Sequence, residues 1–353
     1  MLLALACTAI CVFLGLIYTL LVLFSPSIKR PGPGAFEYRS NNDPTVTHPL
    51  PLPTAAPECD LSVVVPAYNE SARLPPMLTE AMSHVLSNNI AWKTVEFLIV
   101  DDGSKDTTSD VALKFPVPED PKSGVNVSIR VVKLPKNSGK GAAVKHGMLH
   151  ARGKRMLMVD ADGASKFSDL DKLWAAMDAG ADVVCGSRAH LVGTEAVVKR
   201  SLLRNLLMHT LHTLLRFLGV SHIRDTQCGF KLFTRSAAHT LFETLHIPHW
   251  IFDVELLVVA LMCGMRTDEV SVGWHEVAGS KINIIWDSAE MLKDLLVLRA
   301  NYIFGRWTVS RIDSPTQTQP TETGNGHLTP PRKVQTLKSV SPQPRRRVTR
   351  VDS

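Results

Sequence analysis

Apolar runs of strand length alternate with helical patterns from residue 61 to about residue 275. The runs consist mostly of Val, Ile, Leu and Met, a composition typical of strands that are covered on both faces of a sheet. They occupy residues 61–66, 95–100, 127–132, 155–159 and 182–185.

Helices are predicted between these strands, at residues 74–86, from 104–108 onward and after Gly141. A fourth begins at Ser168, where Asp171 three residues later completes a capping pattern. The alternation of strands and helices predicts an α/β domain with a mostly parallel sheet and helices on both faces.

Polar residues end four of these strands, in the segments 66–70, 101–104, 160–162 and 186–188. Open α/β sheets bind ligands at the carboxyl ends of their strands. Each segment alone could be an ordinary turn, because Asp, Asn, Gly and Ser are the usual turn formers. Four such segments together favour a ligand site.

Asp160 and Asp162 are the most informative of these residues. Two carboxylates at positions i and i+2 after a strand repel each other at pH 7, and Mg²⁺ or Mn²⁺ bound between them and a diphosphate would relieve that repulsion. Asp101 and Asp102 could accept hydrogen bonds from a ribose or a uracil imide, or one of them could cap a helix. Residues 137–141 are rich in Gly and Lys but lack the P-loop pattern.

Residues 1–24 carry no charged side chain and are numerous enough to cross a membrane as a helix. We predict a transmembrane anchor; a cleaved signal peptide is the alternative, but such peptides have a basic start and a shorter apolar run. Lys29 and Arg30 follow the run, which predicts a single-pass topology with the rest of the chain in the cytosol. Sugar on Asn126, which begins a glycosylation sequon, would contradict this topology.

The rest of the chain divides into three segments. Pro-rich residues 25–58 predict an extended linker, 59–310 a catalytic domain, and 311–353 a disordered tail. The tail holds eight Lys and Arg against three acidic residues, so it accounts for most of the formal net charge of +6. The folded part is nearly neutral, and nucleic-acid binding is not predicted. The six cysteines lack metal-ligand spacing, which favours a reducing compartment.

Two further stretches, residues 202–218 and 291–307, carry apolar side chains along one helical face. Each is either a helix of the core or a helix that lies in a membrane interface.

Several motifs together resemble the inverting glycosyltransferases of the GT-A fold that act on polyprenyl phosphates. The motifs lie at residues 64–70, 100–104, 139–141, 160–163 and 225–231. Within that group, the segments 160–167, 186–190, 250–255 and 279–281 are similar to the dolichyl-phosphate β-glucosyltransferases rather than to the mannosyl-transferring enzymes. The resemblance covers about residues 61–307.

This resemblance implies transfer of glucose from UDP-glucose to dolichyl phosphate, with inversion, at the cytosolic face of the endoplasmic reticulum membrane. The products would be UDP and dolichyl β-D-glucosyl phosphate, a glucose donor for N-glycan precursor assembly. The resemblance and the strand-end pattern together predict a nucleotide-sugar site formed by Pro66, Tyr68, Glu70, Asp101, Asp102, Lys140, Asp160 and Lys231.

The acceptor determines what the catalytic residues must supply. A phosphate monoester is largely a dianion at pH 7, so the enzyme needs cationic groups more than a base. Guanidinium groups suit this task, and Arg188 is the first candidate. The resemblance implies that Arg188 and one of Arg200 and Arg204 contact the two phosphates.

Acidic residues complete the predicted catalytic set, which is Asp162, Arg188, Arg200 and Asp253. Asp253 and Glu255 begin an apolar helix, where a carboxylate could simply favour the helix dipole. The resemblance implies contact with the sugar or with the ligands around the metal instead.

Two rival functions fit the same residues. One is the same fold using GDP-mannose or a different prenyl chain. The other is a non-catalytic membrane protein that binds a nucleotide sugar, against which the presence of the acidic pair together with Arg188 argues.

Overall fold

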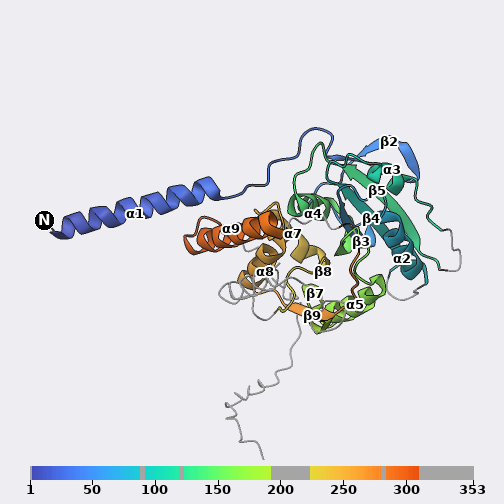
Figure 1. Ribbon diagram of the computed structural model, residues 1–353. Coiled ribbons are helices and arrows are strands. Elements are labelled where there is room, and N and C mark those ends of the chain that lie inside the picture. The colour runs from blue at the N-terminus through green and yellow to red at the C-terminus, as the bar shows by residue number, and fades with distance from the viewer. Residues whose placement is uncertain are drawn as a thin grey trace, which may run out of the picture. The chain divides into compact units, whose positions relative to one another are not determined.

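The computed structural model describes residues 2–87, 92–118, 123–191, 223–277, 279 and 284–309. Within these ranges one mixed sheet forms the centre of the fold (Figure 1). Its strands are β1 (Glu37–Ser40), β2 (Asp43–Pro49), β3 (Cys59–Ala67), β4 (Thr94–Asp101), β5 (Asn126–Lys133), β6 (Gly153–Val159), β7 (Val183–Ser187), β8 (Phe230–Thr234) and β9 (Thr267–Ser271). They lie in the order β2-β1-β5-β4-β3-β6-β8-β7-β9.

Helices cover both faces of this sheet, as predicted (Figure 1). The helices of the described residues are α1 (Leu2–Phe24), α2 (Leu74–Ser87), α3 (Thr108–Leu113), α4 (Lys140–His150), α5 (Leu170–Asp178), α7 (Arg235–Thr244), α8 (Phe252–Met262) and α9 (Ile284–Ile303), with short 3₁₀ turns η1 (Phe167–Asp169) and η2 (Ala189–Leu191). Alternate residues of β3 point to opposite faces: Val64 packs with α4, α7 and α8, whereas Val63 and Val65 pack with α2 and α5.

The five predicted strands correspond to β3, β4, β5, β6 and β7. The sheet is not mostly parallel, however, which corrects the prediction. Strands β5, β4, β3 and β6 run parallel, and so do β7 and β9. Strand β8, which follows the motif that begins at Asp225, lies between β6 and β7 and is antiparallel to both.

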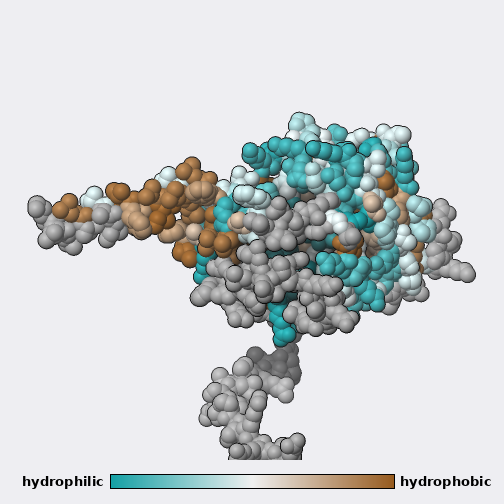
Figure 2. All heavy atoms as spheres, viewed as in Figure 1, coloured by the Kyte–Doolittle hydropathy of each residue, from teal (hydrophilic) through white to brown (hydrophobic). Residues whose placement is uncertain are grey.

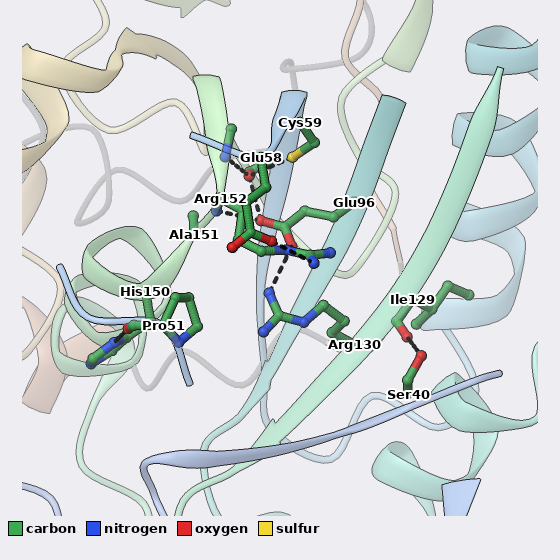
Figure 3. Close-up of polar contacts among 12 residues, drawn as sticks. Ser40, Pro51, Glu58, Cys59, Glu96, Ile129, Arg130, His150, Ala151 and Arg152 are labelled. Carbon is green, nitrogen blue, oxygen red and sulfur yellow. Dashed lines mark hydrogen bonds and ion pairs between the residues drawn. The ribbon is translucent and has the colours of Figure 1, made fainter. Parts of the chain in front are cut away.

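Residues 37–49 do not belong to an extended linker, which is a second correction. They form the hairpin β1–β2, whose first strand adds antiparallel to β5 at the sheet edge. The Arg130 guanidinium lies 3.6 Å from the centroid of the Tyr38 ring. It also donates to Glu96, 2.8 Å away (Figure 3). This cation–π contact and ion pair attach the hairpin to the central strands.

The Glu96 carboxylate is fully buried and accepts hydrogen bonds from four groups (Figure 3). Besides Arg130, the donors are the Ser62 hydroxyl and the backbone and side-chain nitrogens of Arg152. A buried charge of this kind is tolerated because each oxygen is paired. The network lies toward the amino ends of the parallel strands, away from the predicted ligand site.

The start of α5 also differs from the prediction. Ser168 lies inside the η1 turn, and Asp169 is the residue that precedes α5, without a side-chain capping bond. The Asp169 carboxylate instead accepts from the backbone of Gly273, because it faces the segment after β9.

The N-terminal residues form the helix α1, along which apolar residues gather (brown in Figure 2). No helix in the described part of the chain meets the combined length and apolarity needed to cross a membrane. The predicted transmembrane anchor is therefore not confirmed. The Ser25 hydroxyl, just after α1, accepts hydrogen bonds from Asn301 and Arg306.

Helix α9 contains most of the second predicted amphipathic stretch. Its Leu295 and Leu298 side chains are buried in the core, whereas Leu292, Leu296 and Ile303 are exposed. The first stretch, residues 202–218, and the predicted tail, residues 311–353, lie outside the described residues.

Candidate active site

The Gly139-Lys140-Gly141 segment begins α4 and packs tightly against the segment before α8. A Cβ atom on Gly139 would lie 2.5 Å from the Pro248 carbonyl oxygen, and the φ of Gly139 is +97°. One on Gly141 would lie 2.6 Å from the Ile247 carbonyl oxygen. Only glycine fits at either position, so this pair of glycines brings the Lys140 side chain against the strand ends.

Asp160 follows β6 and forms an ion pair with Lys140, with 2.6 Å between Oδ1 and Nζ. Its other oxygen is held close to Gly229, where an added Cβ would lie 2.0 Å from Oδ2. Burial opposes a positive charge on Lys140, but the carboxylates of Asp160 and Asp253 raise the pKa of the ammonium group above its ordinary value.

Asp162 lies two residues farther along the same loop, and its Oδ1 accepts from the Ala164 backbone at 3.0 Å. Burial and the nearby negative charge of Asp160 raise the pKa of Asp162 above its ordinary value. The two carboxylates therefore repel each other as predicted, which a bound cation would relieve.

Arg73 and Glu70 form a second ion pair beside this loop. The guanidinium makes two hydrogen bonds to the Glu70 carboxylate, at 2.5 and 2.7 Å. These bonds raise the pKa of Arg73, and the charges of Asp160 and Asp162 contribute further. Arg73 therefore lies near enough to the acidic pair for both of its charges to act on the guanidinium.

Asp253 and Lys231 form an ion pair that is almost fully buried, with 2.7 Å between Oδ1 and Nζ. Lys231 also donates to the Cys228 carbonyl oxygen at 2.6 Å. Burial raises the pKa of Asp253 despite the opposing effect of Lys231 and Lys140. Both predicted residues thus lie next to the site. Their charged groups are bound to each other and contribute to the electrostatic field there.

Arg188 follows β7 and meets Asp225, the first residue of the predicted 225–231 motif. The guanidinium donates through Nε and one terminal nitrogen to the two carboxylate oxygens, at 2.7 and 2.9 Å. Burial opposes the charge, but Asp225 raises the pKa of Arg188, to which the Asp160 charge also contributes. About one third of the Arg188 side chain is exposed, and its guanidinium lies 5.7 Å from the Trp274 ring centroid.

Asp101 and Asp102 have internal hydrogen-bond partners at the end of β4. The Asp101 carboxylate accepts from the Ser104 backbone and the Ser109 hydroxyl, which closes the loop before α3. Asp102 accepts from the backbone nitrogens of Ser138 and Gly139, just before α4. Burial raises the pKa of Asp102 to about 6. Asp102 thus holds the segment just before α4, while contact with a nucleotide stays a prediction for both residues.

Pro66 and Tyr68 lie at the end of β3, partly exposed. Between Tyr68 and Glu70, Asn69 adopts a left-handed φ of +54° and accepts from the Lys105 backbone, so the ends of β3 and β4 are joined. This placement agrees with the predicted strand-end site, although their contact with a nucleotide is not tested.

Glu255 does not belong to the site. Its buried carboxylate accepts from the backbone nitrogens of His246 and Ile247 and from the His246 ring. The predicted contact with sugar or metal is wrong for this residue, because its oxygens hold the turn after α7. Arg200 and Arg204 lie outside the described residues.

Sequence reasoning missed two charged partners, Arg73 and Asp225. Arg73 lies three residues after Glu70 at the start of a helix, a spacing that allows an ion pair. Asp225 stands in a motif whose position in the sheet was not predicted. Neither residue could be paired with its partner from sequence alone, since Arg188 and Asp225 are 37 positions apart.

The donor set fits a divalent cation that is completed by a ligand. Among the described residues, no cluster of three or more His, Cys, Asp and Glu side chains could hold a metal by itself. Asp160 and Asp162 supply two carboxylates, and Mg²⁺ commonly takes one or two carboxylates plus phosphate oxygens and water.

Residues 62–242 match the family described as glycosyl transferase family 2. A dolichyl-phosphate β-glucosyltransferase of Saccharomyces cerevisiae is 42% identical over 306 residues, which cover 82% of this chain and 90% of the relative. A dolichyl-phosphate β-glucosyltransferase of Homo sapiens is 45% identical over 274 residues, which cover 74% of this chain and 82% of the relative. A crystal structure described as a mycobacterial protein covers 76% of this chain and 84% of its own, with 20% identity and a TM-score of 0.50, which is a likeness of fold alone.

Proposed function

This chain belongs to glycosyl transferase family 2, among the dolichyl-phosphate β-glucosyltransferases, and we propose that it transfers glucose from UDP-glucose to dolichyl phosphate. The products are UDP and dolichyl β-D-glucosyl phosphate. The observation that carries this proposal is the acidic pair Asp160 and Asp162 after β6, with Lys140 in contact with Asp160. Arg73 and Arg188 lie near enough for the charge of Asp160 to raise their pKa values.

The acidic pair supports the binding of a divalent cation, Mg²⁺ or Mn²⁺, by Asp160 and Asp162. When bound, such an ion neutralises the diphosphate of the donor and makes UDP a better leaving group. The Lys231–Asp253 pair borders this region and keeps a fixed pattern of charge there. Fixed charges stabilise a developing negative charge without reorganising during the reaction.

Cationic side chains support the phosphate chemistry of both substrates. The acceptor phosphate is already largely ionised at pH 7, so it can attack the anomeric carbon without a protein base. Arg188 offers a planar guanidinium whose direction is fixed by Asp225. We assign Arg188 to the substrate phosphates, together with Arg200 or Arg204, and Lys140 to the donor.

Glucose as the sugar is supported by the named relatives and by the motifs at 160–167 and 250–255. No described contact selects glucose by itself. Purified protein offered equal UDP-glucose and GDP-mannose with dolichyl phosphate should yield the glucosyl lipid. Predominant mannosyl transfer would contradict the proposed donor.

The location of the enzyme is proposed from its sequence and its acceptor. We place the catalytic domain at the cytosolic face of the endoplasmic reticulum membrane, since Lys29 and Arg30 follow the apolar segment 1–24. Cys59, Cys185, Cys228 and Cys263 carry free thiols, in agreement with a reducing compartment. Asn126 is exposed, so a lumenal domain would be open to glycosylation there. Treatment with a glycosidase should leave the mass of the protein unchanged.

The proposed reaction is tested with membranes that contain the protein and receive labelled UDP-glucose and dolichyl phosphate. We expect label in a glycolipid that mild acid cleaves to glucose, and loss of that label when a chelator is added. Membranes without the protein are the control. Absence of labelled lipid from membranes that contain the folded protein would contradict the function, and a product that forms equally with chelator would contradict the role of the cation.

A further inference from the structure

Lys140 and Lys231 are both paired with an aspartate, but the two ion pairs differ in their access to solvent. The Lys231 and Asp253 side chains are only 1% and 4% exposed. Those of Lys140 and Asp160 are 21% and 31% exposed. The Lys231–Asp253 pair is a permanent part of the interior, whereas the Lys140–Asp160 pair is partly open to solvent and separates at a lower cost.

The Lys140 ammonium lies against Oδ1 of Asp160, with 2.6 Å between this oxygen and Nζ. Oδ1 is a buried atom. Both oxygens lie close to Gly229, where an added Cβ would be 2.6 Å from Oδ1 and 2.0 Å from Oδ2, so the carboxylate has little freedom to turn. A divalent cation that binds this carboxylate at about 2.1 Å therefore comes close to the ammonium, and the two positive charges repel each other.

We propose that Lys140 neutralises Asp160 in the metal-free enzyme and is displaced from it by the divalent cation, after which its ammonium binds the donor diphosphate. This inference rests on the proposed function, because it concerns the same cation and donor. The lysine thus keeps the site charge-balanced before substrate arrives. It is then released at the moment when a cation is needed on the leaving group.

The backbone at Lys140 is suited to this exchange. Gly139 and Gly141 fix the start of α4 against the segment 247–252, so the backbone of Lys140 stays in place while its flexible side chain moves. The Trp250 ring, 5.9 Å from Nζ, offers an aromatic surface along which the ammonium can move. The N-terminus of α4, eleven residues long, favours an anion at the same place.

The exchange predicts that the full-length Lys140→Met variant, purified in detergent, binds one ligand more tightly and the other more weakly than wild type does. Without nucleotide, Mn²⁺ should bind about tenfold more tightly than to wild type, because the competing ammonium is gone. At saturating Mn²⁺, UDP should bind about tenfold more weakly, because the released ammonium is missing. Both affinities are measured by calorimetric titration with MnCl₂ and with UDP.

Lys145→Met is the matched control, since Lys145 lies on the same helix and donates to the carbonyl oxygens of Glu243 and Leu245. It should leave the affinity for Mn²⁺ unchanged. If Lys140→Met does not fold, Lys140→Gln serves in its place, with circular dichroism as the check. Lys140→Arg should retain competition with Mn²⁺.

Unchanged or weaker Mn²⁺ binding by the folded variant would overturn the exchange and leave an ordinary structural ion pair. Unchanged UDP binding would overturn the second half of the proposal. If wild-type protein transfers glucose but Lys140→Met gives either of these results, the inference alone is refuted. Wild-type protein that transfers no glucose refutes the proposed function instead.

Discussion

Gly229 leaves open the space that the Asp160 carboxylate occupies. The residue has no side chain, and the Asp160 carboxylate fills the space where a Cβ would lie. We expect Gly229→Ala to displace Asp160 and to lower glucosyl transfer by about a hundredfold, since a shift of 1 Å in a reacting group can have that effect. The rate of labelled lipid formation measures this loss.

Gly32→Ala is a suitable control for this substitution. A Cβ on Gly32 would meet only Pro135, at an ordinary contact distance of 3.6 Å. Activity of Gly229→Ala equal to that of Gly32→Ala would contradict the tight contact at Asp160.

Asp225 positions Arg188 through two hydrogen bonds and is not expected to touch the substrates. Asp225→Asn should remove the fixed direction of the guanidinium and lower kcat by about tenfold or more, with a smaller change in KM. Asp178→Asn, which breaks the exposed ion pair with Arg155, should leave kcat unchanged. A rise in KM alone would show that Asp225 contributes to binding rather than to positioning.

The sequence predicts some of these residues and not others, for physical reasons. Asp160, Asp162 and Arg188 follow apolar runs directly, so their place at strand ends can be read from the hydrophobic pattern. The hydrogen bonds that the carboxylates of Asp101 and Glu255 accept cannot be predicted from this pattern. Their partners come from loops whose approach depends on packing, as at Gly139 and Gly141.

At the scale of elements, Glu96 of β4 connects three strands and the segment before β6. Glu96→Gln would remove the charge that pairs with Arg130 and Arg152. The buried Arg130 would lose its carboxylate partner, and Arg152 would keep only the exposed Glu58. Breaking a buried ion pair typically costs about 3 kcal/mol in the free energy of unfolding. We expect a loss of that size in urea unfolding.

The matched control for this change is Glu58→Gln. Glu58 also pairs with Arg152, at 3.1 Å, but its side chain is 55% exposed. Exposed pairs contribute about 0–1 kcal/mol. Equal losses in the two variants would contradict a special role for the buried network.

Helix α4 carries two histidines on the face that contacts the N-terminal segment. His146 bonds to the Ala35 carbonyl oxygen and His150 to that of Pro51, each at 2.7 Å. Burial lowers the pKa of His146 to about 4, and it also lowers the pKa of His150. The rings therefore stay neutral in the folded protein under conditions that protonate them in the unfolded chain.

This difference predicts how stability depends on pH. The unfolded chain takes up a proton near the ordinary histidine pKa of 6.5, whereas folded His146 does so only near 4. Stability should fall as pH is lowered across that interval, by about 3 kcal/mol for His146. His146→Gln, which keeps a donor for Ala35, should flatten the dependence measured by urea unfolding. An unchanged slope would contradict a buried neutral ring.

The strands in the middle of the sheet can be predicted from sequence more readily than those at its edges. Long apolar runs predicted β3 to β7, whereas the hairpin β1–β2 lies in a Pro-rich segment whose exposed strands lack such a run. Its attachment depends on Tyr38 and Arg130, which are far apart in sequence. Strand β8 was missed because it is only five residues long. It runs antiparallel between β6 and β7, outside the alternation of strands and helices on which the prediction rests.

At the scale of the whole molecule, the Pro-rich segment is part of the catalytic unit rather than a spacer. Residues 1–312 form one compact unit. Within it, Arg235 of α7 donates to the Ala55 carbonyl oxygen at 2.7 Å, and Arg306 after α9 donates to Ser25. The segment thus has contacts to the last helices of the fold, which ties the N-terminal residues to the domain that carries the site.

The central claim is that the acidic pair serves glucosyl transfer rather than the fold. Purified Asp162→Ala protein, assayed with labelled UDP-glucose and dolichyl phosphate, tests it most directly. We predict that transfer and Mn²⁺-dependent UDP binding are lost while the melting temperature is not lowered, because burial and Asp160 already disfavour the Asp162 charge. Transfer at the wild-type rate by this variant would contradict the account.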